Sequence, residues 1–120
     1  MDKLKELRML INGAVATDGY HKYSPFQGYP VITDGVLAVA KAANCFWFLD
    51  VIGSYQGNKH LSKIFQVWTL NVDLEKCTAV VTGCNDATPV VTQVIGFTDF
   101  PLEEFTVYCI NGVILLPSEY

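Results

Sequence analysis

The sequence predicts an α+β protein in which N-terminal helices pack on one face of a mainly antiparallel sheet of about four to six strands. Its first half has apolar residues at helical spacing, whereas short runs rich in Val, Ile and Thr follow from about residue 64. An Asn-Gly pair joins the last two runs, which is typical of a β-hairpin. A chain of 120 residues is long enough for one core, so we expect a single domain over residues 1–120.

The first predicted helix lies in DKLKELRMLING and ends at Gly13, because glycine tolerates the left-handed conformation found at helix ends. Its apolar side chains recur three or four positions apart on one face: Leu4, Leu7, Leu10 and Ile11. The next stretch, AVATDGYHKYSPFQGYP, has the Gly and Pro content of a loop. We expect one short strand in it, around Tyr20 to Tyr23.

Two more helices are predicted between residues 35 and 56. Thr33 or Asp34 is a suitable N-cap for a helix that runs from about Gly35 to Ala43. The segment CFWFLDVIGSYQ then continues with apolar residues on nearly every face, so we expect protein to surround it. It is predicted to be the central helix of the core, in which truncation of Trp47 would leave a large cavity.

Five runs predict strands, because each is rich in β-branched or aromatic residues and is closed by Asn, Asp, Gly or Pro. They are IFQVWTLNVD, KCTAVVTGC, PVVTQVIGF, FTVYCI and VILLP. Asn111-Gly112 suits a type I′ turn, which requires positive φ at both central residues. The cross-strand pairs expected from this turn are Ile110 with Val113 and Tyr108 with Leu115. We expect the last strand to end at Pro117 and to form an edge of the sheet.

Composition and charge exclude several classes of protein. Hydrophobic residues make up 51% of the chain and charged residues 17%, which is typical of a folded domain. The net charge is −4: residues 1–60 carry six basic and five acidic side chains, whereas residues 61–120 carry two basic and seven acidic ones. Direct nucleic-acid binding needs clustered Lys and Arg, so we do not expect it. The most apolar stretch, VLAVAKAANCFWFLDVIG, is interrupted by polar residues, so we expect no membrane span.

The cysteines and histidines give no sign of a metal site. Cys45, Cys77, Cys84 and Cys109 are isolated in the sequence and show no C-x-x-C spacing. The start of the chain, MDKLKELRML, lacks the apolar run of a secretory signal, so we expect a cytoplasmic protein with reduced thiols. The common nucleotide, hydrolase and zinc-protease motifs are absent. We therefore expect no catalytic residues, no metal and no cofactor.

An acidic group near the C-terminus is the strongest candidate for a partner-binding site. Thr98 or Asp99 is expected to begin a one-turn helix in TDFPLEEF, with Pro101 and the acids in its first positions. Beside the expected edge strand, these acids would attract a basic partner. The alternative is that they only keep the edge soluble. The predicted partner-binding residues are Asp99, Glu103, Glu104 and Glu119.

Three segments resemble a family of small bacterial and phage proteins known only as a domain of unknown function. They are TDGVLAVAKAANCFWFLDVIGSYQ, FQVWTLNV and TDFPLEEFTVYCINGVILLPSEY. The resemblance covers about residues 30–120, and it implies no activity and no catalytic residues. It does imply carriage on phages, prophages and plasmids, where small acidic proteins often act by binding host machinery.

The sequence leaves three functional hypotheses open. The first is a non-enzymatic interaction protein of a phage or mobile element that binds a host protein or nucleoprotein complex with a basic surface. An inhibitor of a host defence complex, in the manner of anti-CRISPR proteins, is one form of it. The second is a small enzyme or ligand-binding domain with a pocket between sheet and helices, where Asp50 meets His21 or His60. The third is a structural homo-oligomer, such as a homodimer, assembled through the terminal strand.

Overall fold

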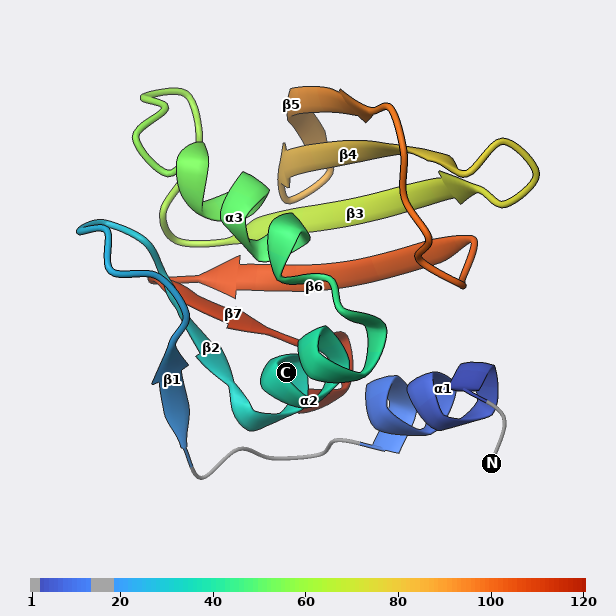
Figure 1. Ribbon diagram of the computed structural model, residues 1–120. Coiled ribbons are helices and arrows are strands. Elements are labelled where there is room, and N and C mark those ends of the chain that lie inside the picture. Colours follow the sequence, from blue (N-terminus) through green and yellow to red (C-terminus); the bar gives the residue numbers. More distant parts are fainter. Residues whose placement is uncertain (1–2, 14–18) are drawn as a thin grey trace.

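The computed structural model describes residues 3–13 and 19–120 as an α+β fold with three α-helices and a seven-stranded sheet (Figure 1). The helices are α1 (Lys3–Gly13), α2 (Asp34–Ala43) and α3 (Phe46–Ser54), and a 3₁₀ turn, η1 (Pro117–Glu119), follows the last strand. The strands are β1 (Tyr20–Lys22), β2 (Val31–Thr33), β3 (Gln66–Asp73), β4 (Thr78–Asn85), β5 (Thr88–Ile95), β6 (Glu104–Ile110) and β7 (Val113–Leu115). The part of the predicted loop that spans residues 14–18 lies outside the described residues.

The strands are arranged in the order β1-β2-β7-β6-β3-β4-β5. Every neighbouring pair is antiparallel except β2 and β7, which run parallel. The α+β class is confirmed, and every strand pair but one is antiparallel, in a sheet that has seven strands where four to six were expected. The strand that sequence reasoning missed is β2, because three residues directly before a helix carry too little pattern to predict a strand.

The position of β7 contradicts the expectation that the C-terminal strand forms a sheet edge. β7 lies between β6 and β2, and Val31 and Ile32 pair with Val113 and Ile114. The backbone N–H of Val31 also donates to the carbonyl of Gly112 at 3.0 Å. The edges of the sheet are instead β1 and β5.

The β6–β7 hairpin itself is confirmed. Asn111 has φ 49° and Gly112 has φ 81°, as a type I′ turn requires. The register is also the expected one, with Tyr108 opposite Leu115 and Ile110 opposite Val113. The strand ends at Leu115, and Pro117 begins η1 because its fixed φ suits the first position of a helical turn.

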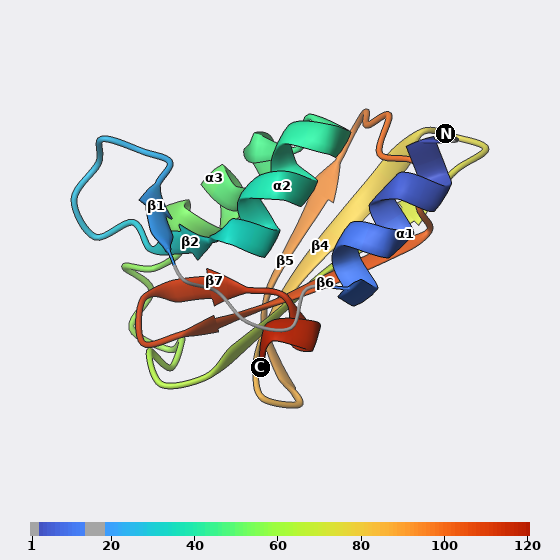
Figure 2. The ribbon, with the colours of Figure 1, turned by 90° about the horizontal axis from the view of Figure 1, so that it is seen from below.

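All three helices lie on the same face of the sheet (Figure 2). Thr33 is the N-cap of α2: its side-chain oxygen accepts from the N–H of Val36 at 3.3 Å. Asn44 ends this helix with a left-handed φ of 54°. In the described part of the chain, no helix is long and apolar enough to cross a membrane.

The core lies between α3 and the central strands, as predicted for this helix. Phe48, Leu49 and Ile52 of α3 are at most 1% exposed. Phe48 packs on Phe105 of β6, with ring centroids 5.9 Å apart. Alternation along each strand turns every second side chain toward the helices and leaves the others on the opposite face, away from α1, α2 and α3.

The tryptophan at the centre of the core is Trp68 of β3, not Trp47. Trp68 is fully buried, and its indole N–H donates to the side-chain oxygen of Gln66 at 2.8 Å. Trp47 is only partly buried, because its position on α3 lies next to the side of the helix that faces solvent. The substitution that should leave a large cavity is therefore Trp68→Ala and not Trp47→Ala.

We expect Trp68→Ala to lower the free energy of unfolding by about 3–5 kcal/mol, because it removes a fully buried indole. Trp47→Ala, which removes a partly exposed ring of the same size, should cost clearly less. Urea denaturation of both variants measures the difference. Equal losses would show that Trp47 contributes to the core as strongly as Trp68 does.

Candidate functional site

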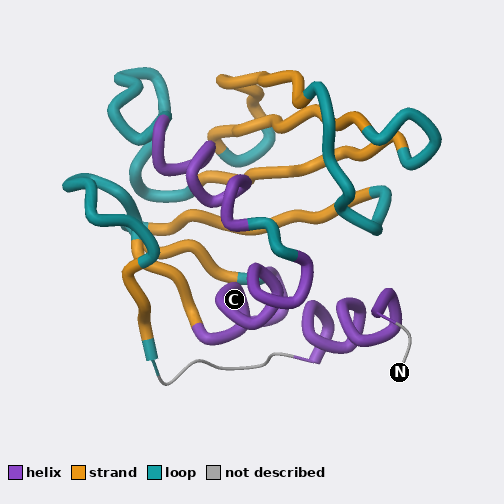
Figure 3. Tube along the Cα trace, viewed as in Figure 1, coloured by secondary structure: helices purple, strands orange, loops and turns teal. Residues whose placement is uncertain are grey.

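Two connections bring acidic residues together at one end of the sheet. The turn between β3 and β4 and the connection between β5 and β6 lie side by side there (Figure 3). The N–H of Thr98 donates to the carbonyl of Cys77 at 2.8 Å, and the N–H of Val72 donates to the carbonyl of Glu103 at 2.8 Å. We call the five acidic residues gathered by these contacts the acidic end: Asp73, Glu75, Asp99, Glu103 and Glu104. All five side chains are exposed.

The TDFPLEEF segment does not contain the expected one-turn helix. Residues 98–103 are irregular, and the side-chain oxygen of Thr98 accepts from the N–H of Phe100 at 3.1 Å. Phe100 and Leu102 are both buried, at 2% and 7% exposure. Two buried side chains at alternate positions require an extended chain, and this requirement overrides the local preference for a helical turn. The extended chain leaves Asp99, Glu103 and Glu104 facing solvent.

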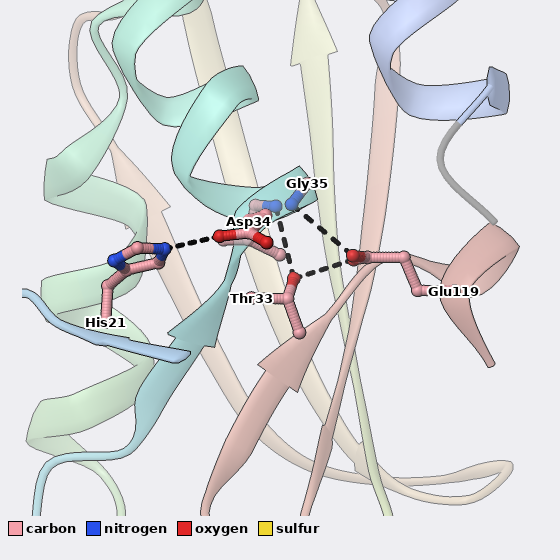
Figure 4. A network of polar contacts seen from close by, with 6 residues as sticks. His21, Thr33, Asp34, Gly35 and Glu119 are labelled. Carbon is pink, nitrogen blue, oxygen red and sulfur yellow. Dashed lines mark hydrogen bonds and ion pairs between the residues drawn. The ribbon is translucent and has the colours of Figure 1, made fainter. Parts of the chain in front are cut away.

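Glu119, the fourth predicted partner-binding residue, lies apart from the acidic end and is engaged within the protein (Figure 4). Its carboxylate accepts from the Thr33 hydroxyl at 2.7 Å, from the N–H of Leu116 at 2.9 Å and from the N–H of Gly35 at 3.3 Å. A Cβ at position 35 would lie 2.8 Å from a carboxylate oxygen of Glu119, so only glycine allows this approach. The negative charge also lies at the N-terminus of α2, where the helix dipole favours it.

A groove opens between α1 and the acidic end, with a volume of about 520 Å³. Leu4 and Ile11 of α1 line one side, and Leu74 and Leu102 line the other. The charged lining residues are Arg8, Glu103 and Glu104. Within residues 3–13 and 19–120, no salt bridge joins Arg8 to either glutamate. The groove thus combines apolar side chains with two carboxylates that form no salt bridge with a described cation.

No hydrogen bond within the described part of the chain joins Asp50 to a histidine, as the acid–base site of the second hypothesis would need. The Nε2 atom of His21 lies 2.5 Å from Asp34 Oδ1, and both side chains are partly exposed (Figure 4). Asp50 is exposed on α3, and His60 is exposed in the loop after it. Among the described residues, neither histidine hydrogen-bonds to Asp50. Sequence reasoning missed the contact of His21 with Asp34 because β1 and β2 must first pair to bring them together.

The four cysteines are free thiols, as expected. Burial raises the pKa of Cys45 to about 12 and that of Cys109 to about 12, and it also raises the pKa of Cys84. Burial, with the charge of Asp50 as a second cause, raises the pKa of Tyr23 above its usual range. The neutral phenol of Tyr23 donates to the carbonyl of Leu49 at 2.8 Å. These shifts disfavour ionised nucleophiles, and the described residues contain no group of three metal-ligating side chains.

Comparison with known proteins places the chain in a family. Residues 5–120 match a family described as a family of unknown function, DUF6876. The chain belongs to this family. No curated protein matches the DUF6876 chain, and no solved structure matches it either.

The DUF6876 match covers more of the chain than the resemblance suggested, which began near residue 30. It starts at residue 5 and therefore includes most of α1 and one wall of the groove. The match extends to residue 120 and so includes Glu119 and the acidic end.

Removal of the Glu119 carboxylate is expected to destabilise the fold. Glu119→Ala leaves the Thr33 hydroxyl and two backbone N–H groups without their acceptor, at a cost of about 1–3 kcal/mol in the free energy of unfolding. Glu103→Ala, which removes an exposed carboxylate of the acidic end, should change it by no more than about 0.5 kcal/mol. Urea denaturation compares the two. If both variants were as stable as the parent, the contacts of Glu119 would contribute nothing to stability.

The buried thiols should make stability fall at high pH. The unfolded chain loses these protons near pH 9, whereas the folded protein keeps them until about pH 12. Over this interval the folded protein therefore binds more protons at Cys45 and Cys109 than the unfolded chain does. Each thiol lowers the free energy of unfolding by up to about 1.4 kcal/mol per pH unit as the pH rises. Replacing both by Ala should make the curve of stability against pH flatter above pH 9. Urea denaturation at several pH values measures the slope, and identical slopes would contradict the prediction.

Proposed function

We propose that the protein is a non-enzymatic interaction protein whose acidic end binds a basic surface of another protein or nucleoprotein complex. The observation that carries the proposal is the groove beside the acidic end, which has apolar walls and two carboxylates unpaired with Arg8. A partner segment with Lys or Arg next to an apolar side chain fits this combination. The apolar side chain would fill the groove, and the cation would meet Glu103 and Glu104.

Charge supports a basic partner over a neutral one. The acidic end carries five carboxylates; Arg8 of α1 lines the groove beside it, and Lys76 lies in the β3–β4 turn. An excess of one sign of charge on one surface accelerates encounter with a partner of the opposite sign and slows encounter with others. Exposed Leu74, at 46%, adds apolar area beside the carboxylates.

Within this proposal, we infer that the protein is carried by a phage or mobile element and inhibits a host defence complex, as anti-CRISPR proteins do. Nucleoprotein complexes hold their nucleic acid through clustered Lys and Arg. An acidic end of this kind would compete for such a basic surface without binding nucleic acid itself. The enzyme hypothesis receives no comparable support, because neither histidine hydrogen-bonds to Asp50 in the described part of the chain.

Charge reversal at the acidic end should slow association with the partner. A partner complex is first captured from a bacterial host, and its association rate is then measured at about 50 and about 500 mM salt. Glu103→Lys with Glu104→Lys should lower the rate at low salt by about tenfold and weaken its salt dependence. Arg8→Glu, on the other wall of the groove, should raise the rate.

The matched controls separate electrostatics from damage to the fold. Glu104→Lys and Asp50→Lys give the same net charge, but Asp50 lies on α3, away from the groove. Only Glu104→Lys should slow association, and all variants should melt near the parent temperature because exposed charges contribute little to stability. If Arg8→Glu slowed association as much as the reversal of Glu103 and Glu104, the electrostatic proposal would be wrong.

Protection of a phage tests the biological part of the proposal. A targeted phage is plated on a bacterial strain with an active CRISPR system that expresses the parent protein or a variant. The parent and Asp50→Lys should restore plaque formation, whereas the Glu103→Lys, Glu104→Lys double variant should not. Failure of the parent to protect, together with failure to capture any nucleoprotein complex, would rule out the defence-inhibitor function.

A further inference from the structure

β5 is an edge strand whose outer side is not paired with any described segment of the chain. It pairs with β4 on one side and ends the strand order on the other. In an antiparallel strand, alternate residues direct their N–H and C=O groups to the same neighbour. Every second residue of β5 therefore presents backbone groups to solvent, in the geometry that a further strand would need.

The chemistry of this edge is unusual for an exposed strand. From Thr88 to Phe97 the sequence TPVVTQVIGF contains no charged residue. Val94 is 74% exposed and Phe97 is 75% exposed. Natural sheets protect their edges with charged side chains, with proline or with bulges. Here Pro89 and the irregularity opposite Gly83 and Cys84 affect only the start of β5, so the segment from Val91 to Ile95 is regular and unprotected.

We infer that β5 pairs with β5 of a second copy of the chain, antiparallel and about a two-fold axis through Gln93. Such an axis, perpendicular to the sheet, keeps the helices of both copies on one side. Residues that lie directly opposite each other must then be on the same face of the joined sheet. Because side chains alternate between faces along a strand, this requires that one residue lies opposite its own copy, and the axis passes between these two. Centring on Gln93 pairs the regular segment with itself and leaves Pro89 and the bulge outside the contact.

The resulting side-chain pairs suit a stable strand contact. On the outer face, Thr92 lies opposite Val94 of the second copy, and Val94 lies opposite its Thr92. On the helix face, Val91 lies opposite Ile95 of the second copy. Such β-branched neighbours pack well across antiparallel strands. The Gln93 side chain accepts from the Tyr55 hydroxyl at 2.8 Å, which holds it in place at the axis.

Charge distribution favours a second copy over a basic partner at this edge. The strand is neutral, so it offers nothing to attract a cation, and two copies meet without like charges within the paired segment. β5 runs toward the acidic end, which begins at Asp99 on this side. Antiparallel pairing therefore places the two acidic ends at opposite ends of the joined sheet, and the two negative regions stay apart.

The dimer should respond to salt differently from the complex of the proposed function. Each copy carries a net charge of −4, so added salt screens repulsion and should hold or strengthen the dimer. A complex between the acidic end and a basic partner should instead weaken. This difference makes the failure of one proposal distinguishable from the failure of the other.

Sedimentation of the purified full chain over a dilution series tests the edge contact. Val94→Lys places two Lys side chains on diagonal positions across the axis, about 7–8 Å apart. We expect it to raise the dimer dissociation constant by at least about tenfold. The matched control is Val80→Lys on β4, which is the cross-strand neighbour of Val94 on the same outer face. Val80→Lys should leave the dimer unchanged, and circular dichroism verifies that both variants are folded.

A cross-link tests the position of the axis. Gln93→Cys would place two thiols on residues whose Cα atoms are about 4.5–5.5 Å apart, within reach of a disulfide. Thr88→Cys, five positions from the axis, would leave them about 33 Å apart. Under mild oxidation we expect a covalent dimer from Gln93→Cys and none beyond the level of the parent chain from Thr88→Cys.

Four results would overturn the inference. They are a parent chain that stays monomeric, a Val94→Lys variant that dimerises like the parent, a dimer broken by Val80→Lys alone, and cross-linking that does not distinguish Cys at 93 from Cys at 88. The third would assign the contact to the outer face of the sheet. If the parent chain stays monomeric and β5 instead pairs with a strand of another protein, the inference is also wrong.

Discussion

The parallel pairing of β2 with β7 is the contact on which the rest of the structure depends. It joins residues 31 and 32 to residues 113 and 114, and it makes one sheet of the N-terminal and C-terminal strands. Because β2 leads directly into α2, the pairing also fixes where this helix begins above the sheet. Glu119 then reaches the start of α2 and accepts hydrogen bonds from Thr33 and Gly35. The apolar C-terminus is thus held on both sides, by strands and by a helix.

Sequence reasoning succeeded where structure is decided by neighbouring residues. The Asn111-Gly112 turn set both the hairpin and its register, and Thr33 was a suitable N-cap whatever the helix packs against. It failed where distant segments decide the outcome. Whether β7 is an edge depends on a three-residue strand about 80 positions away. Likewise, Trp47 and Trp68 both lie in apolar runs, and only the packing of α3 on the sheet determines which of them is buried.

The candidate site also has a part that the sequence predicted and a part that only the fold determines. The charge imbalance between the two halves pointed to acidic residues, and Asp99, Glu103 and Glu104 do lie together at one end of the sheet. Their neighbours Asp73 and Glu75 come from a different hairpin, and the groove needs α1 from the start of the chain. Glu119 looked equivalent to the other acids in sequence, yet its carboxylate is satisfied internally. Charge alone cannot distinguish a carboxylate that faces a partner from one that caps a helix.

The acidic end and the edge strand β5 have complementary roles in our proposals, because charge is concentrated at one and absent from the other. The acidic end favours fast encounter with a basic surface, whereas the neutral edge provides unpaired backbone and β-branched side chains for a lasting contact. Since β5 leads to the acidic end, a two-fold axis through Gln93 gives a dimer with one acidic end at each extremity. In the proposed dimer, the two identical sites would bind two basic surfaces of a repeated partner at once. The second binding event then becomes intramolecular, so overall affinity would rise without any new contact.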